Sequence, residues 1–233
     1  VIEYIMTLLN SNYEDWRRQN PEKSYEDFPF SIKKMSISGC LLDIDKLNDV
    51  SKNTIARMSS DEVYNAILFW SMTEDPDFHA HLKADPLYAK RILSIGRGGA
   101  KPRKDLTTWK DSKPYMALFY DDYFKKQDDY SEKFNPADIK AVLCRFMESY
   151  DENDDASLWF AKLKEIAAEL GFAAEMKEYK SNPEQFKGSI GDVSGFVRIA
   201  VTGKTNSPDL YEVIHILGRE RTFDRIQKEI QAL

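Results

Sequence analysis

The sequence predicts an all-α protein with two consecutive helical domains. Apolar residues recur at three- and four-residue spacing through most of the 233 residues, as they do along amphipathic helices. Proline, glycine and short polar stretches separate these segments at intervals typical of helix ends. Residues 197–201 are rich in Val and Ile and resemble a strand, but the sequence supplies no second strand to pair with it. A sheet is therefore not expected.

Helical spacing begins at once, in "VIEYIMTLLN", and no N-cap residue precedes it. Because the chain opens inside a helix, we expect it to be a fragment with a segment missing before Val1. The capping sequence "SSD" at 59–61 predicts the start of a further helix that continues through Met72. Pro76 and Pro86 then introduce two shorter helices, "DFHAHLKA" and "LYAKRILSIG".

A glycine-rich stretch at 96–105, "GRGGAKPRKD", is typical of a turn. An aromatic-rich helix is expected over 112–124, "SKPYMALFYDDYF". The polar segment that follows, 125–136, ends on a proline and predicts a domain boundary, which we place between residues 131 and 132.

Beyond this boundary, Pro136 marks the start of the helix "ADIKAVLCRFMESY". The acidic stretch 151–157 is expected to be a solvated loop, and "LWFAKLKEIAAELG" forms a helix that stops at Gly171. Three segments complete the chain: "GSIGDVSGFVRIAVTG", "DLYEVIHILG" and "RERTFDRIQKEI".

Composition excludes several functional classes. The chain is 42% hydrophobic and 31% charged, as expected for an ordinary globular protein, and no apolar run approaches the roughly 18 residues that span a bilayer. No signal-peptide pattern is present. The two cysteines, Cys40 and Cys144, predict reduced thiols and a cytoplasmic location. The net charge of −6 argues against indiscriminate coating of nucleic acid, although not against a local basic surface.

No arrangement of residues indicates an active site. His79 and His81 point to different sides of a helix, and no cysteine cluster accompanies them, so a metal site is not expected. The "TGKT" sequence matches only the end of a phosphate-binding loop, since Arg198 stands where that motif requires glycine. The paired carboxylates are typical of solvated faces, and no nucleophile is accompanied by a base.

The charged residues nevertheless follow a pattern. Between Asp85 and Asp105 there is no acidic residue, whereas six residues are basic: Lys90, Arg91, Arg97, Lys101, Arg103 and Lys104. On an acidic protein such a basic stripe predicts a surface that faces phosphates. The alternative is a basic helix face and loop without a partner.

A family resemblance narrows these alternatives. The segment 198–226, "RIAVTGKTNSPDLYEVIHILGRERTFDRI", resembles the end of bacterial glutamyl-tRNA synthetases. There the pattern is Leu-Arg-x-Ala-Leu-Thr-Gly, then Ser/Thr-Pro-x-Leu-(Phe/Tyr)-Glu, then Leu-Gly-(Lys/Arg)-Glu-Arg. Weaker matches are "ALFYDDY" at 117–123, "KPRKD" at 101–105 and the first 16 residues. The resemblance implies the tail of a helical stem-contact domain over 1–45, followed by two helical anticodon-binding domains over 46–131 and 132–233.

The resemblance also implies which residues contact tRNA. Arg198 takes the place of an arginine that contacts an anticodon base, and Ser207 and Leu210 take the places of residues that line an anticodon pocket. Arg103, or Lys104 if the alignment shifts by one residue, takes the place of the arginine that reads the third anticodon position. Arginine offers a planar fork of donors, and leucine packs against a base face. From the basic stripe we add Lys101 and Arg97 as tRNA-binding residues.

Two motifs depart from the family pattern. The Asp-Lys-Leu-x-Trp-x-Asn signature appears as "DKLNDVS", with Asp49 and Ser51 in place of tryptophan and asparagine. The stretch "KKMSISG" at 33–39 looks like the ATP-binding "KMSKS" loop with Ile37 in place of a lysine. It lies seven residues before "LDIDKL", where the family has Val-Ser-Lys-Ser-Pro, so it is interpreted as a look-alike without catalytic duty.

The resemblance therefore implies the tRNA-recognising part of a glutamate–tRNA ligase, with no catalytic residue of its own. The complete enzyme would use ATP and Mg²⁺ in an upstream domain, whereas this part would need no cofactor. The expected partner is tRNA-Glu, with tRNA-Gln as a further candidate, bound by a monomer that binds neither DNA nor membrane. Two alternatives stay open: a paralogue that charges tRNA-Gln or both tRNAs, and a helical interaction module without an RNA role.

Overall fold

The computed structural model describes residues 1–35, 41–99 and 101–233. Cys40 and residues 36–39 of the "KKMSISG" stretch thus lie outside the described residues. The protein is about 67% helical, and the described residues contain no strand, which confirms the predicted all-α class. Their one β feature is an isolated bridge between Ala173 and Ser189.

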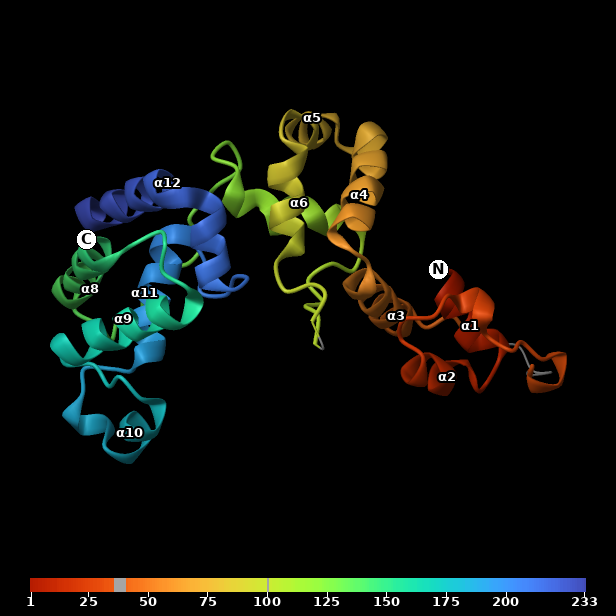
Figure 1. The fold of residues 1–233 in the computed structure, drawn as a ribbon, viewed down its shortest axis with the longest axis horizontal. Helices are drawn as coiled ribbons and strands as arrows, with labels where there is room; N and C mark the ends of the chain where they lie inside the picture. The colour runs from red at the N-terminus through yellow and green to blue at the C-terminus, as the bar shows by residue number, and fades with distance from the viewer. Residues whose placement is uncertain (36–40, 100) are drawn as a thin grey trace. The chain divides into compact units, whose positions relative to one another are not determined.

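The chain forms two compact units, Val1–Met116 and Ala117–Leu233. The first unit contains seven α-helices and three short 3₁₀ helices among its described residues (Figure 1). In chain order these are α1 (Ile2–Leu9), α2 (Tyr13–Gln19), η1 (Tyr25–Asp27), η2 (Ile32–Lys34), α3 (Ile44–Arg57), α4 (Ser60–Glu74), α5 (Pro76–Ala84), α6 (Pro86–Ser94), η3 (Trp109–Asp111) and α7 (Ser112–Met116).

The predicted helix starts in this unit are confirmed. Ser59 caps α4, and its capping box with Glu62 supplies partners for backbone N–H groups that the helix leaves unbonded. Pro76 and Pro86 occupy the first positions of α5 and α6, where a missing N–H costs nothing. Helix α4 packs against both α5 and α6 through side chains that are fully buried, among them Ile67.

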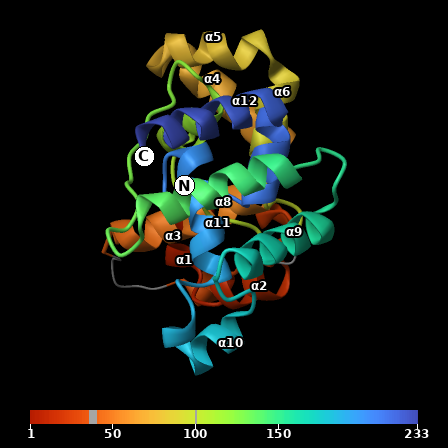
Figure 2. The same cartoon turned by 90° about the vertical axis from the view of Figure 1, so that its left-hand side faces the viewer.

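The second unit contains five α-helices and two 3₁₀ helices: η4 (Ala117–Phe119), α8 (Pro136–Ser149), α9 (Ala156–Glu169), α10 (Met176–Ser181), η5 (Pro183–Gln185), α11 (Ile190–Thr202) and α12 (Leu210–Ala232). Helix α11 is its centre and packs against α8, α9 and α12 (Figure 2). Gly218, with φ of 79°, interrupts α12 between the sequence segments "DLYEVIHILG" and "RERTFDRIQKEI".

The "TGKT" sequence ends a helix. Residues 197–201, which resemble a strand in sequence, lie within α11, and Gly203 caps its C-terminus with φ of 70°. A side chain at position 203 would place its Cβ 2.9 Å from the Lys125 carbonyl oxygen and from Lys126 Cα. Glycine is therefore required here by both backbone conformation and close packing.

The helix predicted over 112–124 is shorter than expected. The α-helix ends at Met116, a 3₁₀ turn covers Ala117–Phe119, and turns follow. Arginine side chains of α12 bind carbonyl groups that would accept backbone hydrogen bonds in a longer helix. Arg225 donates to Leu118 O and Arg221 to Phe119 O. The local sequence contains no sign of this competition.

The segment 117–131 belongs to the second unit, whereas the sequence places the domain boundary after it. Backbone N–H groups of Gln127 and Asp128 both donate to Gly203 O, at 2.8 and 3.0 Å. The Asp128 carboxylate accepts from the backbone and hydroxyl of Thr205. These bonds attach the polar segment to the end of α11, so the units separate between Met116 and Ala117. The predicted boundaries at 45/46 and 131/132 remain predictions.

Candidate nucleic-acid interface

The basic loop 96–105 is closed by glycine geometry. Gly96 and Gly98 have φ of 66° and 73°, and Arg103 N donates to Gly96 O at 3.0 Å. A Cβ on Gly96 would lie 2.6 Å from Cγ and Cδ of Arg103. The glycine therefore lets the stem of Arg103 lie across the backbone and fixes where this side chain leaves the loop.

The guanidinium of Arg103 forms a two-point ion pair within the loop. Its Nε and Nη2 donate to the two carboxylate oxygens of Asp105, at 2.8 and 2.7 Å. This fork geometry holds the side chain in a defined orientation while about 38% of it stays exposed. Arg103 is thus an ordered cation of the loop that is still partly exposed.

Arg97 has a structural role in this unit. Its Nε donates to Leu93 O of α6, and its Nη1 donates to Ile55 O and Met58 O at the end of α3. Burial lowers the pKa of this guanidinium. Arg97 thereby joins the C-terminal ends of two helices, and the tRNA contact predicted for it remains a prediction.

Lys101 and Lys104 present free charges. Both side chains are exposed, and neither ammonium has a partner among the described residues. Lys90, by contrast, pairs with Asp61 at 2.6 Å. Within the predicted basic stripe, these two lysines are the cations best placed to meet a phosphate in solvent.

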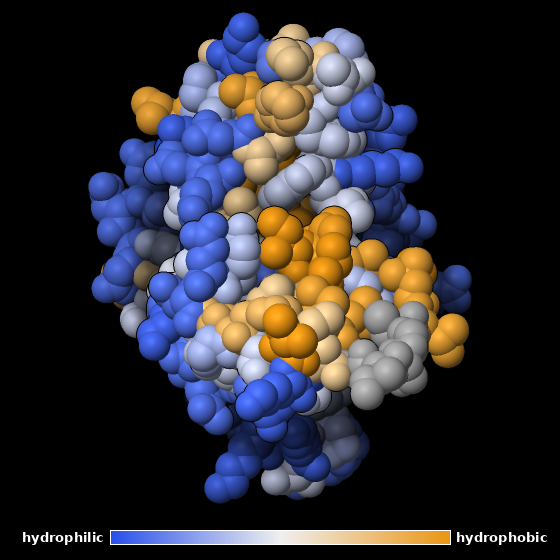
Figure 3. Space-filling model, turned by 90° about the vertical axis from the view of Figure 1, so that its right-hand side faces the viewer, coloured by the Kyte–Doolittle hydropathy of each residue, from blue (hydrophilic) through white to orange (hydrophobic). Residues whose placement is uncertain are grey.

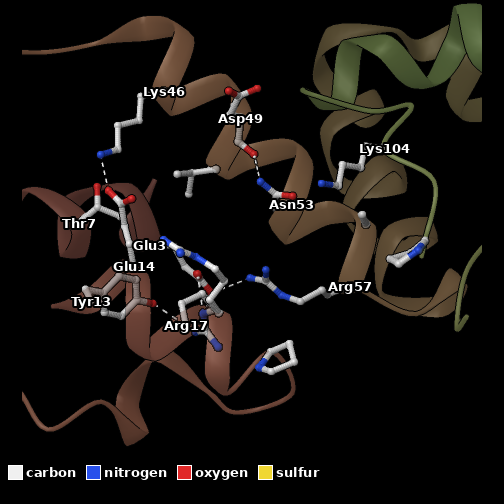
Figure 4. Close-up of a pocket in the computed structure, with 15 residues that line it drawn as sticks. Glu3, Thr7, Tyr13, Glu14, Arg17, Lys46, Asp49, Asn53, Arg57 and Lys104 are labelled. Atoms are coloured by element: carbon white, nitrogen blue, oxygen red, sulfur yellow. Dashed lines mark hydrogen bonds and ion pairs between the residues drawn. The ribbon is translucent and has the colours of Figure 1, made fainter. Parts of the chain in front are cut away.

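Lys104 borders a cleft that the sequence does not predict. This cleft, of about 690 Å³, lies between α1, α2, α3 and the loop that carries Lys104 (Figure 4). Figure 4 shows the Lys104 side chain directed toward Asn53 of α3. Asp49, which replaces a tryptophan of the family signature, also lines it.

An ion-pair cluster forms the inner wall of this cleft. Glu3 of α1 accepts from Arg17 of α2 at 2.9 Å and from Arg57 of α3 at 3.1 Å, so one carboxylate ties three helices together. Arg17 also donates to the Tyr13 hydroxyl at 3.2 Å. The partners come from positions 14 and 54 residues away, and no local pattern indicates this cluster.

Arg198 and Ser207 meet in the second unit. Arg198 Nη1 donates to Ser207 Oγ at 2.5 Å and to Pro208 O at 3.0 Å. Ser207 is 8% exposed, and its hydroxyl donates to Pro208 O. Arg198 is half-buried. The turn after α11 thus holds the arginine in one orientation.

Leu210 lies in the core at the first position of α12 and is 3% exposed. Asp209 caps this helix by accepting from Glu212 N. Arg198 of α11, Ser207 of the following turn and Leu210 at the start of α12 thus lie around the connection between the two helices, and among these three Arg198 is the most accessible. Contact of Ser207 and Leu210 with an RNA base remains a prediction.

A second arginine system holds this unit together. Arg225 is 4% exposed and donates to Leu118 O, Val201 O and Asp121 Oδ1, while its guanidinium lies 3.7 Å from the centre of the Phe124 ring. Asp121 also pairs with Arg221 at 3.1 Å. The two sequence segments "ALFYDDY" and "RERTFDRI" therefore bind each other. They lie about a hundred residues apart, so the sequence alone does not indicate this contact.

Other candidate sites receive no support. Within residues 1–35, 41–99 and 101–233, no three His, Cys, Asp or Glu side chains are grouped as metal ligands. His79 Nδ1 lies 3.0 Å from Leu68 O, and the His215 ring packs at a tilt of 41° against Tyr211, with ring centres 4.1 Å apart. The described helices include none with the length and hydropathy to span a bilayer.

Comparison with known proteins identifies the family. The model of the family described as "Anticodon binding domain" matches residues 88–230. The chain belongs to this family. Its match covers the loop residues Lys101, Arg103 and Lys104 as well as the turn around Arg198. All the predicted contact residues thus lie within a family domain whose description names anticodon binding.

Relatives extend the match over nearly the whole chain. It is 45% identical over 228 residues to a "Glutamate--tRNA ligase" of Acetivibrio thermocellus, covering 98% of this chain and 42% of that protein. A protein of the same description from Sorangium cellulosum is 41% identical, with 97% and 40% covered. The chain thus spans about two fifths of the length of these relatives.

Solved structures share the fold. A glutamate tRNA ligase from Elizabethkingia meningosepticum, crystallised in complex with its amino acid, has a TM-score of 0.58 to this chain at 17% sequence identity. The match covers 88% of this chain and 35% of that protein.

Proposed function

We propose that this chain is the tRNA-recognising, anticodon-binding part of a glutamate–tRNA ligase. The observation that carries the proposal is the match to such a ligase at 45% identity over 98% of the chain. Two features of the structure support it: unpaired lysines on the loop 96–105, and an arginine oriented by the turn 203–210. Lysines that end in solvent attract phosphates, and an oriented arginine can distinguish bases.

In this proposal the complete ligase activates glutamate with ATP and Mg²⁺ and transfers it to the tRNA. That chemistry belongs to the part of the relatives' length that this chain does not match, about 58% of the Acetivibrio protein. The 233 residues act as a monomer in the cytoplasm, provide recognition and need no cofactor. They are expected to be inactive in aminoacylation alone.

A filter-binding titration with tRNA-Glu transcript tests the proposal. Because phosphate contacts release counterions, binding should weaken steeply as salt rises from about 50 to 200 mM. A tRNA-Gln transcript in parallel measures whether one or both tRNAs are accepted. Absence of binding to either transcript at low salt contradicts an RNA role and leaves a helical interaction module.

A further inference from the structure

The loop 96–105 exposes no large hydrophobic side chain among its described residues. Figure 3 shows hydrophobic residues gathered into one broad area of the molecular surface, and the large hydrophobic side chains that are exposed in the described residues all lie outside this loop. A molecule that binds the loop is therefore bound through charge and hydrogen bonds. Besides the half-buried Arg97, the charged residues of the loop are Lys101, Arg103, Lys104 and Asp105.

Arg103 and Asp105 form an ion pair two residues apart. The carboxylate accepts from Nε and Nη2 of Arg103 at 2.8 and 2.7 Å, and the two side chains stay 38% and 26% exposed. These bonds occupy one side of the planar guanidinium, so its outer end, at Nη1, points away from the carboxylate. The pair lies beside Lys101 and Lys104, whose ammonium groups have no partner among the described residues. One loop thus carries two kinds of basic side chain.

The backbone on both sides of this pair is fixed. On one side, Arg103 N donates to Gly96 O at 3.0 Å. On the other side, Thr107 O accepts from the Ser51 hydroxyl of α3 at 2.6 Å. Asp105 therefore stands on a backbone that is held by the helical part of the unit, and its carboxylate in turn holds the guanidinium.

Neighbouring residues of the loop face different surroundings. Pro102 and Lys104 line the cleft beside α1, α2 and α3, whereas Arg103 and Asp105 are not among its lining residues. Such alternation is typical of extended backbone, in which residues two apart point to the same side. The ion pair and the Lys104 ammonium therefore meet different parts of a bound molecule.

Pairing with a carboxylate also changes what Arg103 attracts. A lysine that ends in solvent carries a full positive charge and gains affinity for any phosphate by releasing counterions. Arg103 and Asp105 together carry no net charge, and a phosphate that approaches the guanidinium also approaches the carboxylate, which repels it. An uncharged acceptor on the edge of a base meets no such repulsion. The planar fork suits two adjacent acceptors, which guanine and cytosine offer.

We propose that Asp105 is a positioning residue that directs Arg103 to the edge of an unpaired base and keeps it from the phosphate backbone. The inference rests on the proposed function and adds to it two separate roles within one loop. Lys101 and Lys104 attract the RNA backbone without regard to sequence. The ion pair presents an oriented and neutralised fork to a base with two adjacent acceptors. An acidic residue at the end of a basic stripe thereby contributes to specificity.

Salt dependence and anticodon discrimination of the 233-residue chain, both measured by filter binding, test this inference. Asp105→Asn leaves the charge of Arg103 without a neutralising carboxylate and weakens its two-point support. The slope of log affinity against log salt should therefore steepen by about 1. The preference for tRNA-Glu over the same tRNA with a substituted anticodon base, expected to be about tenfold, should fall below about threefold. Glu74→Gln, which removes one exposed negative charge at the end of α4, should change neither quantity.

A double variant shows whether Arg103 is the group that responds. Arg103→Ala with Asp105→Asn removes both charges together, so the slope should return to that of the unchanged chain while the preference stays lost. Asp105→Glu keeps a carboxylate beside the guanidinium and should keep the slope of the unchanged chain. A slope about 1 shallower in the double variant would show that Arg103 neutralises a phosphate, which overturns the inference.

The remaining outcomes separate a purely structural role from a failure of the proposed function. If Asp105→Asn lowers the melting temperature and weakens binding to every tRNA alike, with the slope unchanged, Asp105 only supports the loop and the inference is wrong. If Asp105→Asn retains the full preference for tRNA-Glu, the inference is also wrong. Absence of tRNA binding by the unchanged chain at low salt contradicts the proposed function instead, so the two failures are distinguishable.

Discussion

The loop 96–105 and the turn 203–210 both follow a helix that ends at a glycine with positive φ. They differ in whether their basic side chains have hydrogen-bond partners. In the loop, Lys101 and Lys104 end in solvent without a partner among the described residues. At the turn, Arg198 of α11 is held by Ser207 and Pro208, and Ser207 and Leu210 are buried. The two loop lysines therefore suit attraction of any phosphate, whereas the oriented Arg198 suits recognition of one base, and each can be tested separately.

The largest effect is expected from the arginine beneath the turn. Arg225→Met removes the buried guanidinium that donates to Val201 O and Leu118 O and pairs with Asp121. Loss of this network should lower the free energy of unfolding by about 4 kcal/mol. Chemical denaturation measures it. Lys228→Met is the control in the same helix, since Lys228 is 71% exposed and, among the described residues, pairs with Asp224 alone. A change there beyond about 1 kcal/mol is not expected.

The glycine that closes the turn comes next. Gly203→Ala combines a positive φ with a Cβ 2.9 Å from backbone atoms of Lys125 and Lys126, so we expect about 3 kcal/mol of destabilisation. Gly98→Ala in the loop has a similar φ of 73° but no atom within 4 Å of its Cβ. It should cost only the conformational strain, about 1 kcal/mol. Equal losses in the two variants would show that close packing at Gly203 contributes nothing.

The loop lysines should affect RNA binding and not stability. Replacing Lys101 and Lys104 by alanine should reduce the slope of log affinity against log salt by about 1 for each phosphate that is no longer neutralised. The reduction should be the same for tRNAs with different anticodons, because an ammonium is a point charge. Filter binding across salt concentrations measures the slope. Lys83→Ala, at an exposed lysine outside the loop, should leave it unchanged.

The smallest effect concerns pH. Hydrogen bonds from the backbone and side chain of Thr205 lower the pKa of Asp128 below its ordinary value. The stabilisation that this carboxylate contributes is therefore fully present above the pKa that Asp128 has in the unfolded chain. It is lost as the pH falls through the lower pKa of Asp128 in the folded protein. Asp128→Asn should flatten this part of the acid-stability profile. The stability of both proteins is followed by circular dichroism as the pH is lowered. An identical acid-stability profile in the variant would show that Asp128 does not contribute to it.

Local sequence patterns predict most of the fold because helix periodicity and caps are local. The starts at Ser59, Pro76 and Pro86 follow from cap chemistry, and the end of α9 from Gly171. The helix expected over 112–124 is too long because its carbonyls bind arginines about a hundred residues later. The spacing of apolar residues carries no information about side chains far away in the sequence that bind the carbonyl groups of a helix.

The candidate interface is predicted less completely. The sequence groups Arg97 with Lys101, yet Arg97 binds carbonyls of Ile55 and Met58, about forty residues earlier. Charge counting cannot separate a cation that caps helices from one that ends in solvent. The family motif names Arg198, Ser207 and Leu210, whereas the hydrogen bond between Arg198 and Ser207 and the burial of Leu210 appear only in the structure.

The most direct test of the central claim is anticodon discrimination by the unchanged chain. Its affinity for tRNA-Glu is compared with that for the same tRNA carrying each anticodon base substituted, alongside an Arg103→Ala/Arg198→Ala double variant. We predict that at least one substitution weakens binding about tenfold, and that the double variant binds all the tRNAs alike. Equal affinity of the unchanged chain for every anticodon, or discrimination that survives in the double variant, would contradict the account.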